Sequence, residues 1–418
     1  MNERMIALIV TVPLALLLAV SGVRAGEEVD LWPVEVNGKW GYINHTGELI
    51  VPAEFDSAGE FRNTFATLVK RDGKLGCLDG VSCSLLVPVE FDFIHDPRSG
   101  YFVARHGGQW GVISWNRRFV PVPQADSIAP FGEISARFRQ GNLWGYLDHS
   151  GRVTIPAKYV HAGDFEFMSH TVQERFLLAP VHDGDKWGLI TLKDSLAVPF
   201  QFDSVGHSSR GRLAVKIGGR WGYADSSGAV VIPPVYDAVT DFDYDYFPAY
   251  GFGEAVAAVC QAGRWGYINA WNRERASLQY GGLGRVGMNR IAVRQNGKWG
   301  FVDCDERLVI PAVYDTVTEF HGNGAYVRSG NRWGVIDTAG TVVLEPSFDD
   351  VCLSTEPFVL VRKNGRSGFY NAHSRQELGW FDEARPFDRG LACVKDSGVW
   401  KYIDITGRVI WSQPPDEK

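Results

Sequence analysis

The stretch Ile291–Asp303, with the sequence IAVRQNGKWGFVD, indicates how this chain folds. Asn296 and Gly297 stand between two segments in which apolar and polar residues alternate. This is the strongest short signal for a β-hairpin, because both turn residues need a positive φ. Trp299 and Gly300 open the second segment. The stretch therefore predicts two antiparallel strands joined by a two-residue turn.

The Trp-Gly pair recurs along the chain, mostly at intervals of about 34 residues, which is the mark of a tandem repeat. Eight copies keep both residues, and three degenerate copies hold the spacing at Leu75-Gly76, Ser367-Gly368 and Trp400-Lys401. The eight tryptophans are Trp40, Trp110, Trp144, Trp187, Trp221, Trp265, Trp299 and Trp333. One unit of this length cannot bury its own aromatic residues, so neighbouring units must stack.

The rest of each unit adds a turn and two further strands. After Trp-Gly, a short apolar stretch ends in an Asp or Asn such as Asp303, whose side chain is expected to bond its own backbone in a turn. A second apolar strand runs to Pro311, where we expect it to end because proline lacks a backbone N–H. An aromatic-Asp pair follows, Tyr314-Asp315, which we expect to form a fourth short strand with the Asp as a turn residue.

The pattern G-[KR]-W-G-[YFV]-[IV]-[DN], followed by [VI]-[VI]-P and [YF]-D, resembles the bacterial WG-repeat family, also called KWG repeats. The resemblance extends over residues 31–411, with departures around Leu75, Ser367 and Trp400. It implies an all-β repeat array of a kind often exported by bacteria. It implies little about function.

The sequence therefore predicts an all-β fold, a tandem array of about eleven β-meander units. An open or spiralling, solenoid-like array is the preferred arrangement, because eleven units exceed the four to eight blades usual in a ring. A β-propeller-like ring is the alternative. The units are expected over residues 26–411, before a polar tail at 412–418, and to start near residues 31, 68, 102, 135, 177, 212, 255, 290, 324, 358 and 391.

Residues 1–25 have the composition of a secretory signal peptide. Arg4 precedes an apolar run, and Val23-Arg24-Ala25 provides a small-x-small cleavage pattern. An uncleaved membrane anchor is the alternative. We expect a soluble exported protein, periplasmic or extracellular. The formal net charge of −7 argues against nucleic acid as a partner, because phosphate binding needs a basic surface.

Six cysteines in an exported chain permit disulfides. Cys77 and Cys83 flank an expected β-turn, so a bridge across a hairpin is possible between them. Cys260, Cys304, Cys352 and Cys393 are too scattered in sequence to be paired. No metal site is expected, because the sequence has no C-x-x-C spacing.

Two intervals between Trp-Gly marks are longer than the others, and insertions of this kind often form a binding face. The first extends from Phe165 to Phe176 and the second over residues 241–253. Three interpretations fit the second: an aromatic surface for a protein or glycan partner, a cation site, or a longer hairpin packed on its own array. The aromatic candidates are Phe242, Tyr244, Tyr246, Phe247, Tyr250 and Phe252, and the cation candidates are Asp241, Asp243 and Asp245.

The stretch Gly282–Gly287 matches the dinucleotide-binding pattern G-x-G-x-x-G, but no βαβ unit surrounds it, and we interpret its glycines as turn residues. We interpret the tryptophans as packing residues rather than a ligand-stacking ladder, and expect Trp299→Ala to cost about 3–5 kcal/mol. The favoured function is an exported binding or scaffold module for another protein or an envelope polymer, without a cofactor. The alternative is an envelope hydrolase that uses carboxylates gathered from several repeats.

Overall fold

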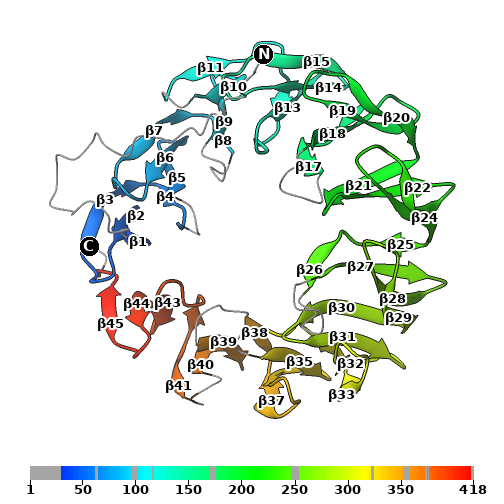
Figure 1. Ribbon diagram of the computed structural model, residues 1–418. Coiled ribbons are helices and arrows are strands. Elements are labelled where there is room, and N and C mark those ends of the chain that lie inside the picture. Colours follow the sequence, from blue (N-terminus) through cyan, green and yellow to red (C-terminus); the bar gives the residue numbers. More distant parts are fainter. Residues whose placement is uncertain are drawn as a thin grey trace, which may run out of the picture.

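The chain forms a closed ring of small antiparallel β-sheets in the computed structural model (Figure 1). Eleven such sheets are present in the residues that the structure describes, which we call blades 1 to 11 in chain order. The described residues are 30–61, 65–95, 101–114, 117–168, 176–245, 254–321, 324–352, 358–371, 374 and 376–415. The expected signal peptide lies outside them.

The strands are distributed over the blades as follows. Blade 1 contains β1 (Trp32–Val36), β2 (Lys39–Ile43) and β3 (Leu49–Phe55); blade 2 contains β4 (Ser57–Ala58), β5 (Ala66–Arg71), β6 (Lys74–Asp79) and β7 (Leu85–Phe91); blade 3 contains β8 (Phe93–Ile94), β9 (Phe102–His106), β10 (Gln109–Ile113) and β11 (Phe119–Pro121); blade 4 contains β12 (Ser127–Ile128), β13 (Ala136–Gln140), β14 (Leu143–Leu147) and β15 (Val153–Tyr159). Blade 5 contains β16 (His161–Ala162), β17 (Glu166–Met168), β18 (Phe176–His182), β19 (Trp187–Thr191) and β20 (Leu196–Phe202); blade 6 contains β21 (Ser204–Ser209), β22 (Arg212–Ile217), β23 (Arg220–Ala224) and β24 (Val230–Tyr236); blade 7 contains β25 (Ala238–Val239), β26 (Asp243–Asp245), β27 (Glu254–Gln261), β28 (Arg264–Asn269) and β29 (Glu274–Tyr280); blade 8 contains β30 (Gly282–Gly287), β31 (Arg290–Gln295), β32 (Lys298–Val302) and β33 (Leu308–Tyr314). Blade 9 contains β34 (Thr316–Val317), β35 (Ala325–Ser329), β36 (Arg332–Ile336) and β37 (Val342–Phe348); blade 10 contains β38 (Asp350–Cys352), β39 (Phe358–Lys363), β40 (Arg366–Asn371) and β41 (Glu377–Phe381); blade 11 contains β42 (Glu383–Ala384), β43 (Leu391–Asp396), β44 (Val399–Asp404) and β45 (Val409–Ser412).

The hairpin expected at Asn296-Gly297 joins β31 to β32, and both residues have positive φ, 51° and 84°. Gly300, directly after Trp299, is required by a close approach of the next strand. A Cβ there would lie 2.5 Å from the carbonyl oxygen of Ile310. The Trp-Gly glycine thus allows β33 to bend across β32.

The outer strands of the blades do not end at their prolines, so the expectation that a proline ends the strand was wrong. Pro52 lies within β3, and the register between β2 and β3 shifts at this point. The strand that contains the proline is the outer edge of its blade, where a missing N–H breaks no ladder bond. The aromatic-Asp pair also differs from expectation. Phe55 ends β3, and the short strand after Asp56 belongs to the next sheet.

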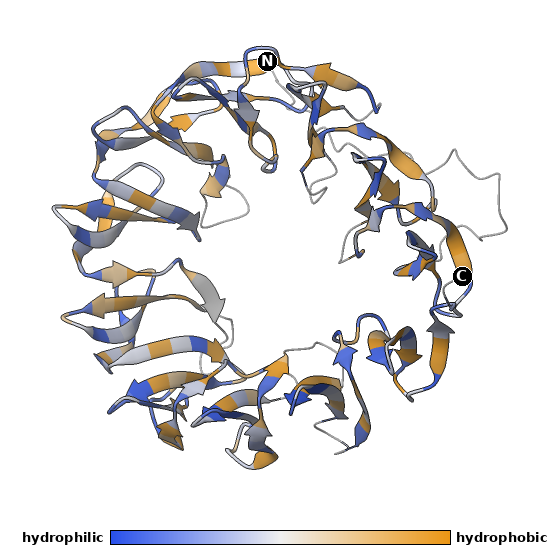
Figure 2. Cartoon of the chain, turned by 180° about the vertical axis from the view of Figure 1, so that it is seen from behind, coloured by the Kyte–Doolittle hydropathy of each residue, from blue (hydrophilic) through white to orange (hydrophobic). Residues whose placement is uncertain are grey.

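The core lies between blades. One cluster of buried residues joins Phe301 and Ile310 of blade 8 to Ala325, Val327 and Ile336 of blade 9. Burying each large apolar side chain contributes roughly 1.5–3 kcal/mol. Apolar segments lie in strands all around the ring (Figure 2). Because each such interface needs two blades, stacking of units stabilises the fold, as expected.

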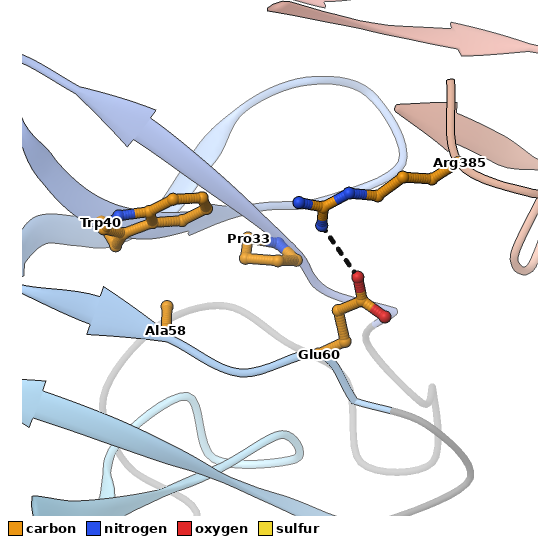
Figure 3. A pocket seen from close by; sticks show the side chains of 5 residues that line it. All are labelled: Pro33, Trp40, Ala58, Glu60 and Arg385. Carbon is orange, nitrogen blue, oxygen red and sulfur yellow. Dashed lines mark hydrogen bonds and ion pairs between the residues drawn. The ribbon is translucent and has the colours of Figure 1, made fainter. Parts of the chain in front are cut away.

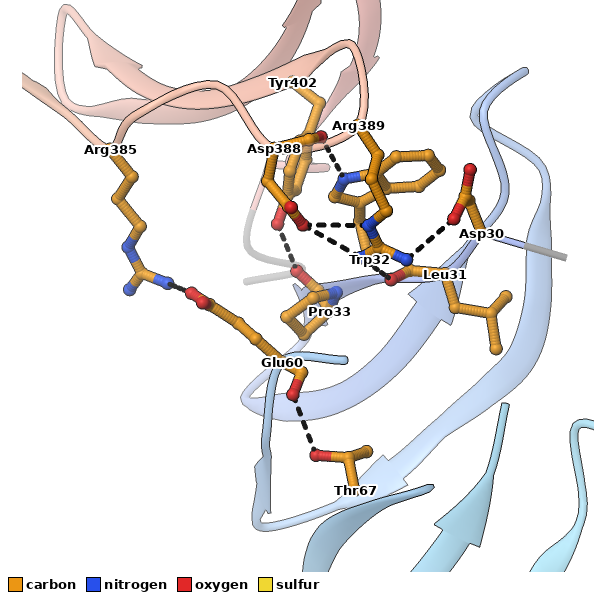
Figure 4. A network of polar contacts seen from close by, with 10 residues as sticks. All are labelled: Asp30, Leu31, Trp32, Pro33, Glu60, Thr67, Arg385, Asp388, Arg389 and Tyr402. Atoms are coloured by element: carbon orange, nitrogen blue, oxygen red, sulfur yellow. Dashed lines mark hydrogen bonds and ion pairs between the residues drawn. The ribbon is translucent and has the colours of Figure 1, made fainter. Parts of the chain in front are cut away.

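The preferred open array was wrong, and the ring alternative is confirmed. Blade 11 packs directly on blade 1, where Trp32, Val34 and Ile43 share a buried cluster with Leu391 and Tyr402. Polar contacts surround this cluster (Figure 4). Blade number does not prevent closure, because the angle between neighbouring blades is set by packing, which the repeat length does not encode. In the described part of the chain, we find no helix with the length and hydropathy needed to cross a membrane.

Arg389 holds the entry to β1 at this seam. Its guanidinium donates to Asp30 at 2.8 Å and to Asp388 at 2.9 Å, and lies 5.1 Å from the centre of the Trp32 ring. The indole Nε1 of Trp32 donates to the carbonyl oxygen of Asp388 at 3.2 Å (Figure 4). The first and last blades are therefore joined by hydrogen bonds as well as by apolar contact.

Candidate functional site

The eight tryptophans of the Trp-Gly pairs are half-buried and pack against the buried clusters between blades. Trp110, for example, stacks on the His95 ring with centroids 6.1 Å apart, and the position of a Cβ on Gly282 lies 3.1 Å from the Trp299 ring. The packing interpretation fits these contacts. The most buried aromatic residue of the unit lies two positions after the Trp of the Trp-Gly pair, as Tyr223 and Phe301 do.

At most junctions in the described part of the ring, the Asp after the aromatic residue joins one blade to the next. Asp56 accepts a hydrogen bond from Lys39 of blade 1 at 2.6 Å and from the backbone N–H of Asp72, in the β5–β6 turn of blade 2, at 2.7 Å. The same two contacts recur at Asp92 with Lys74 and Gly108. The aspartates that accept a bond from a turn N–H of the following blade are Asp56, Asp92, Asp126, Asp203, Asp237, Asp315, Asp349 and Asp382.

These contacts stabilise the ionised carboxylate. The hydrogen bond from Lys74 and the backbone N–H of Gly108 lower the pKa of Asp92 to about 2. The pKa of Asp315 is lowered by the same combination, Lys298 first and then the N–H of Gly330. The turn-capping role predicted for this Asp is thus correct, but the capped turn belongs to the neighbouring blade.

The junction between blades 7 and 8 lacks this carboxylate, because Gly281 occupies the Asp position. Gly281 N–H donates to the carbonyl oxygen of Arg294 at 2.9 Å, as Asp56 N–H donates to Lys70, so the backbone follows the same path. A pocket of about 600 Å³ opens at this place. It is lined by Arg264, Gln279, Gly281, Arg294, Gln295, Asn296 and Gly297.

Two guanidinium groups define the charge of this pocket. Arg264 Nη1 donates to the carbonyl oxygen of Gln279 at 3.1 Å, and Arg294 Nε donates to that of Gly297 at 3.3 Å. Each guanidinium has five N–H groups, so most of its donors are directed elsewhere. Neither contact involves an acid. The pocket therefore offers positive charge and hydrogen-bond donors to a ligand.

A second pocket, of about 370 Å³, lies at the seam of the ring and is lined by Pro33, Trp40, Ala58, Glu60 and Arg385 (Figure 3). Here the two charges face each other. Arg385 Nη1 lies 3.0 Å from Glu60 Oε1 across the pocket. Because its charges are mutually paired and its walls are those that close the ring, this pocket is assigned to structure. The pocket at Gly281 is the candidate functional site.

The insertions contribute strands. In the first, β17 pairs with β18, and Glu166 accepts a bond from Ser208 N–H of the next blade at 3.1 Å. In the second, β26 (Asp243–Asp245) pairs with β27. Phe242 is 1% exposed and packs on Tyr223 with ring centroids 4.7 Å apart. Phe242 is therefore a core residue, and its prediction as a partner-binding residue was wrong.

The other insertion candidates are not gathered into a site by the described residues. Asp241 is exposed. Asp243, Tyr244 and Asp245 form β26, but the placement of their side chains lies outside the description. The remaining candidates, Tyr246, Phe247, Tyr250 and Phe252, fall outside the described residues. Among the residues the structure does describe, no cluster of His, Cys, Asp and Glu has the arrangement of a metal site.

The bridge that the sequence permitted between Cys77 and Cys83 is absent, since neither residue is disulfide-bonded. Cys77 lies in β6 and is paired in register with Val87, not with Cys83. Cys83 lies in the turn, where its Sγ is 3.9 Å from the carbonyl oxygen of Gly80. The strand register, rather than the length of the turn, decides which residues face each other.

The site at Gly281 was missed in the sequence, although a signal for it exists. The cation before Trp and the Asp after the aromatic are 17 residues apart in the pairs Lys39–Asp56 and Lys298–Asp315. At the same spacing, Arg264 is followed by Gly281. Comparing the copies for this pair, rather than for the Trp-Gly mark, would have found the exception.

The fold and the site define a closed, eleven-bladed β-propeller in which one junction between blades carries a cationic pocket. The chain belongs to the family of proteins with the WG containing repeat. The family pattern matches residues 40–74, 84–110, 144–166, 187–221, 221–265, 265–299, 299–333, 333–366 and 381–400. The resemblance seen in the sequence is thus confirmed. No curated protein sequence matches the chain significantly.

Several solved structures are distantly similar. A eukaryotic initiation factor has 10% identity and a TM-score of 0.41, with 76% of this chain and 96% of that chain covered. The extracellular domain of BT4673 from B. thetaiotaomicron has 10% identity and a TM-score of 0.26, covering 93% and 71%. PorZ of the type-IX secretion system of Porphyromonas gingivalis has 10% identity and a TM-score of 0.25, covering 89% and 67%. Similarity this distant indicates no shared function.

Proposed function

We propose that this protein is an exported binding or scaffold module that holds another protein or an envelope polymer and performs no catalysis. The observation that carries the proposal is the pocket at Gly281, where one junction of a regular ring exposes two arginines in place of a structural ion pair. Insertions in repeat proteins often form the binding face, and we treat a junction that departs from the repeat pattern in the same way.

The composition of the pocket favours binding over hydrolysis. Its lining consists of arginine, glutamine, asparagine and glycine residues. Arginine stays protonated in proteins, and the amides do not titrate, so this set supplies neither a nucleophile nor a general base at neutral pH. The aspartates that a hydrolase could recruit, such as Asp56, are paired with Lys39 and a turn N–H. Export agrees with the signal-like composition of residues 1–25.

The proposal is tested by capture from the exported fraction of the source bacterium. Wild-type protein, Gly281→Asp and Gly281→Ala are immobilised, and the retained proteins and polymers are quantified. We expect one partner to be retained by wild type and Gly281→Ala and lost by Gly281→Asp, whose carboxylate occupies the pocket. Equal retention by all three, or turnover of glycans by the purified protein that a single Asp→Asn change abolishes, would contradict the proposal.

A further inference from the structure

The junction between blades 7 and 8 and the junction between blades 9 and 10 are two repeats apart in sequence. They differ at the residue that provides the carboxylate. Between blades 9 and 10, Asp349 pairs with Arg332 through Oδ1 and accepts the N–H of Asn364 through Oδ2 at 2.7 Å. Between blades 7 and 8, the corresponding residues 68 positions earlier are Gly281, Arg264 and Asn296. The cation and the turn are thus kept, and the acid is replaced.

The match extends to the second arginine and the turn glycine. Arg362 and Gly365 at the Asp349 junction correspond to Arg294 and Gly297 at the Gly281 junction; Arg362 pairs with Asp350 at 3.5 Å, and the residue that corresponds to Asp350 is Gly282. The Asn-Gly turns also have the same backbone shape, since Asn296 and Asn364 have φ of 51° and 53°. The arginine and the turn N–H that hold the Asp349 carboxylate are therefore kept around Gly281, and the acid that pairs with the second arginine is replaced by glycine as well.

At one other junction in the described part of the ring, the carboxylate and its cation are both absent. Between blades 4 and 5, the two corresponding positions are Leu143 and Val160, so neither charge remains. At the Gly281 junction, Arg264 remains exposed beside a pocket. A cation kept without its structural acid indicates that another acid fills its role.

We propose that the pocket at Gly281 binds a carboxylate group of the partner, in the place that the Asp349 side chain takes at the equivalent junction. One carboxylate oxygen faces Arg264 and the other accepts the N–H of Asn296, while Arg294, whose position has Gly282 in place of the acid that pairs with Arg362, adds positive charge. The inference rests on the proposed binding function and names its ligand chemistry. A planar guanidinium suits a carboxylate because two parallel N–H groups meet its two oxygens. The carboxylate comes from an Asp or Glu side chain or from the C-terminus of a protein.

The pocket admits such a group without rearrangement. A Cβ on Gly281 would meet only the carbonyl oxygen of Arg294, at 3.5 Å, which is ordinary van der Waals contact. The position has no positive φ. An Asp side chain can therefore stand at residue 281, and so can a carboxylate that enters from outside. This makes Gly281→Asp a direct mimic of the bound state.

The test uses the full-length protein and three short peptides, each acetylated at the N-terminus, observed by fluorescence anisotropy at low ionic strength. One contains a single Asp and an amidated C-terminus, the second has Asn in place of that Asp, and the third has the Asn and a free C-terminal carboxylate. We expect the first or the third to bind wild type at least ten-fold more tightly than the second. Which of the two binds identifies the source of the carboxylate.

Variants at residue 281 and at the equivalent junction test whether the peptide binds at the pocket. Gly281→Asp should weaken the peptide at least ten-fold, and the matched control Gly281→Ala should bind as wild type does. The double change Asp349→Gly and Asp350→Gly, which copies Gly281 and Gly282, should raise the stoichiometry from one peptide to two.

Binding of the Asn amide peptide as tight as that of the carboxylates, binding unaffected by Gly281→Asp, or displacement by inorganic phosphate at lower concentration than by acetate would overturn the inference. If neither carboxylate peptide binds but the captured partner still depends on residue 281, the ligand chemistry is wrong and the proposed function stands.

Discussion

The hydroxyl of Tyr402 in the last blade donates to the carbonyl oxygen of Pro33 in the first blade, at 2.9 Å. At other junctions the equivalent tyrosine donates to a residue just after the short first strand of the next blade, as Tyr223 does to Thr240 at 2.6 Å. Blade 1 has no such strand among the described residues. Tyr402 instead satisfies a carbonyl of β1 itself, and burial raises the pKa of its hydroxyl.

Tyr402→Phe is therefore expected to loosen the seam. Removing the hydroxyl leaves the carbonyl oxygen of Pro33 without this donor, which costs about 1–3 kcal/mol for a buried group. Hydrogen exchange of the backbone amides of residues 31–36 measures the effect. Tyr223→Phe is the matched control, since it removes the same bond inside the ring. Faster exchange of residues 31–36 in the control than in Tyr402→Phe would contradict the assignment of this bond to ring closure.

Gly300→Ala should destabilise the ring by about 1–3 kcal/mol, because the new methyl group would overlap the neighbouring strand β33. The position of that methyl lies 2.5 Å from the carbonyl oxygen of Ile310 and 2.6 Å from the nitrogen of Ala312. Urea denaturation of this variant beside Gly281→Ala provides the comparison. A midpoint for Gly300→Ala equal to that of Gly281→Ala would show that the close approach does not constrain the fold.

Phe301→Ala should reduce the stability of the fold more than Trp299→Ala does, although the sequence pattern singles out the tryptophan. Phe301 is 0% exposed in the cluster between blades 8 and 9, and its removal is expected to cost about 3–5 kcal/mol. Trp299 is half-buried and packs at the margin of the same cluster, so its removal should cost less. Thermal melts of both variants test this order, and a lower melting temperature for Trp299→Ala than for Phe301→Ala would contradict it.

Stability should fall in acid because of the inter-blade aspartates. The folded-state pKa of Asp92 is about 2, below its ordinary value of 3.8. Between these two pKa values the folded state therefore binds fewer protons than the unfolded chain. The stabilisation is present above pH 4 and is lost as the pH falls through 2. Melting temperatures from pH 5 to pH 2 should decrease, and Asp92→Asn should decrease less steeply. Parallel curves would show that Asp92 makes no contribution.

The local structure could be predicted from sequence because its causes are local. The Asn296-Gly297 turn has the positive φ values that its residues favour. Asp303 accepts the backbone N–H groups of Asp305 and Arg307 at 2.9 Å, the turn that its position indicated. Each of these features depends on residues within a few positions of each other.

Ring closure could not be predicted in the same way. It depends on contacts such as Arg389 with Asp30, which join the two ends of the chain and follow no repeat spacing. The candidate site was hidden for a related reason. Arg264, Gly281 and Asn296 become neighbours only because each Asp position faces a turn of the next blade, a relationship that the structure reveals.

The most direct test of the central claim, that the pocket at Gly281 is built to hold a carboxylate, is the thermal unfolding of Gly281→Asp against Gly281→Ala. If Asp at this position pairs with Arg264 and Asn296 as Asp349 does with Arg332 and Asn364, it should stabilise the ring by about 1 kcal/mol relative to Ala. The gain should shrink at pH 2 and in high salt. A Gly281→Asp protein that melts at or below the temperature of Gly281→Ala at neutral pH would contradict the account.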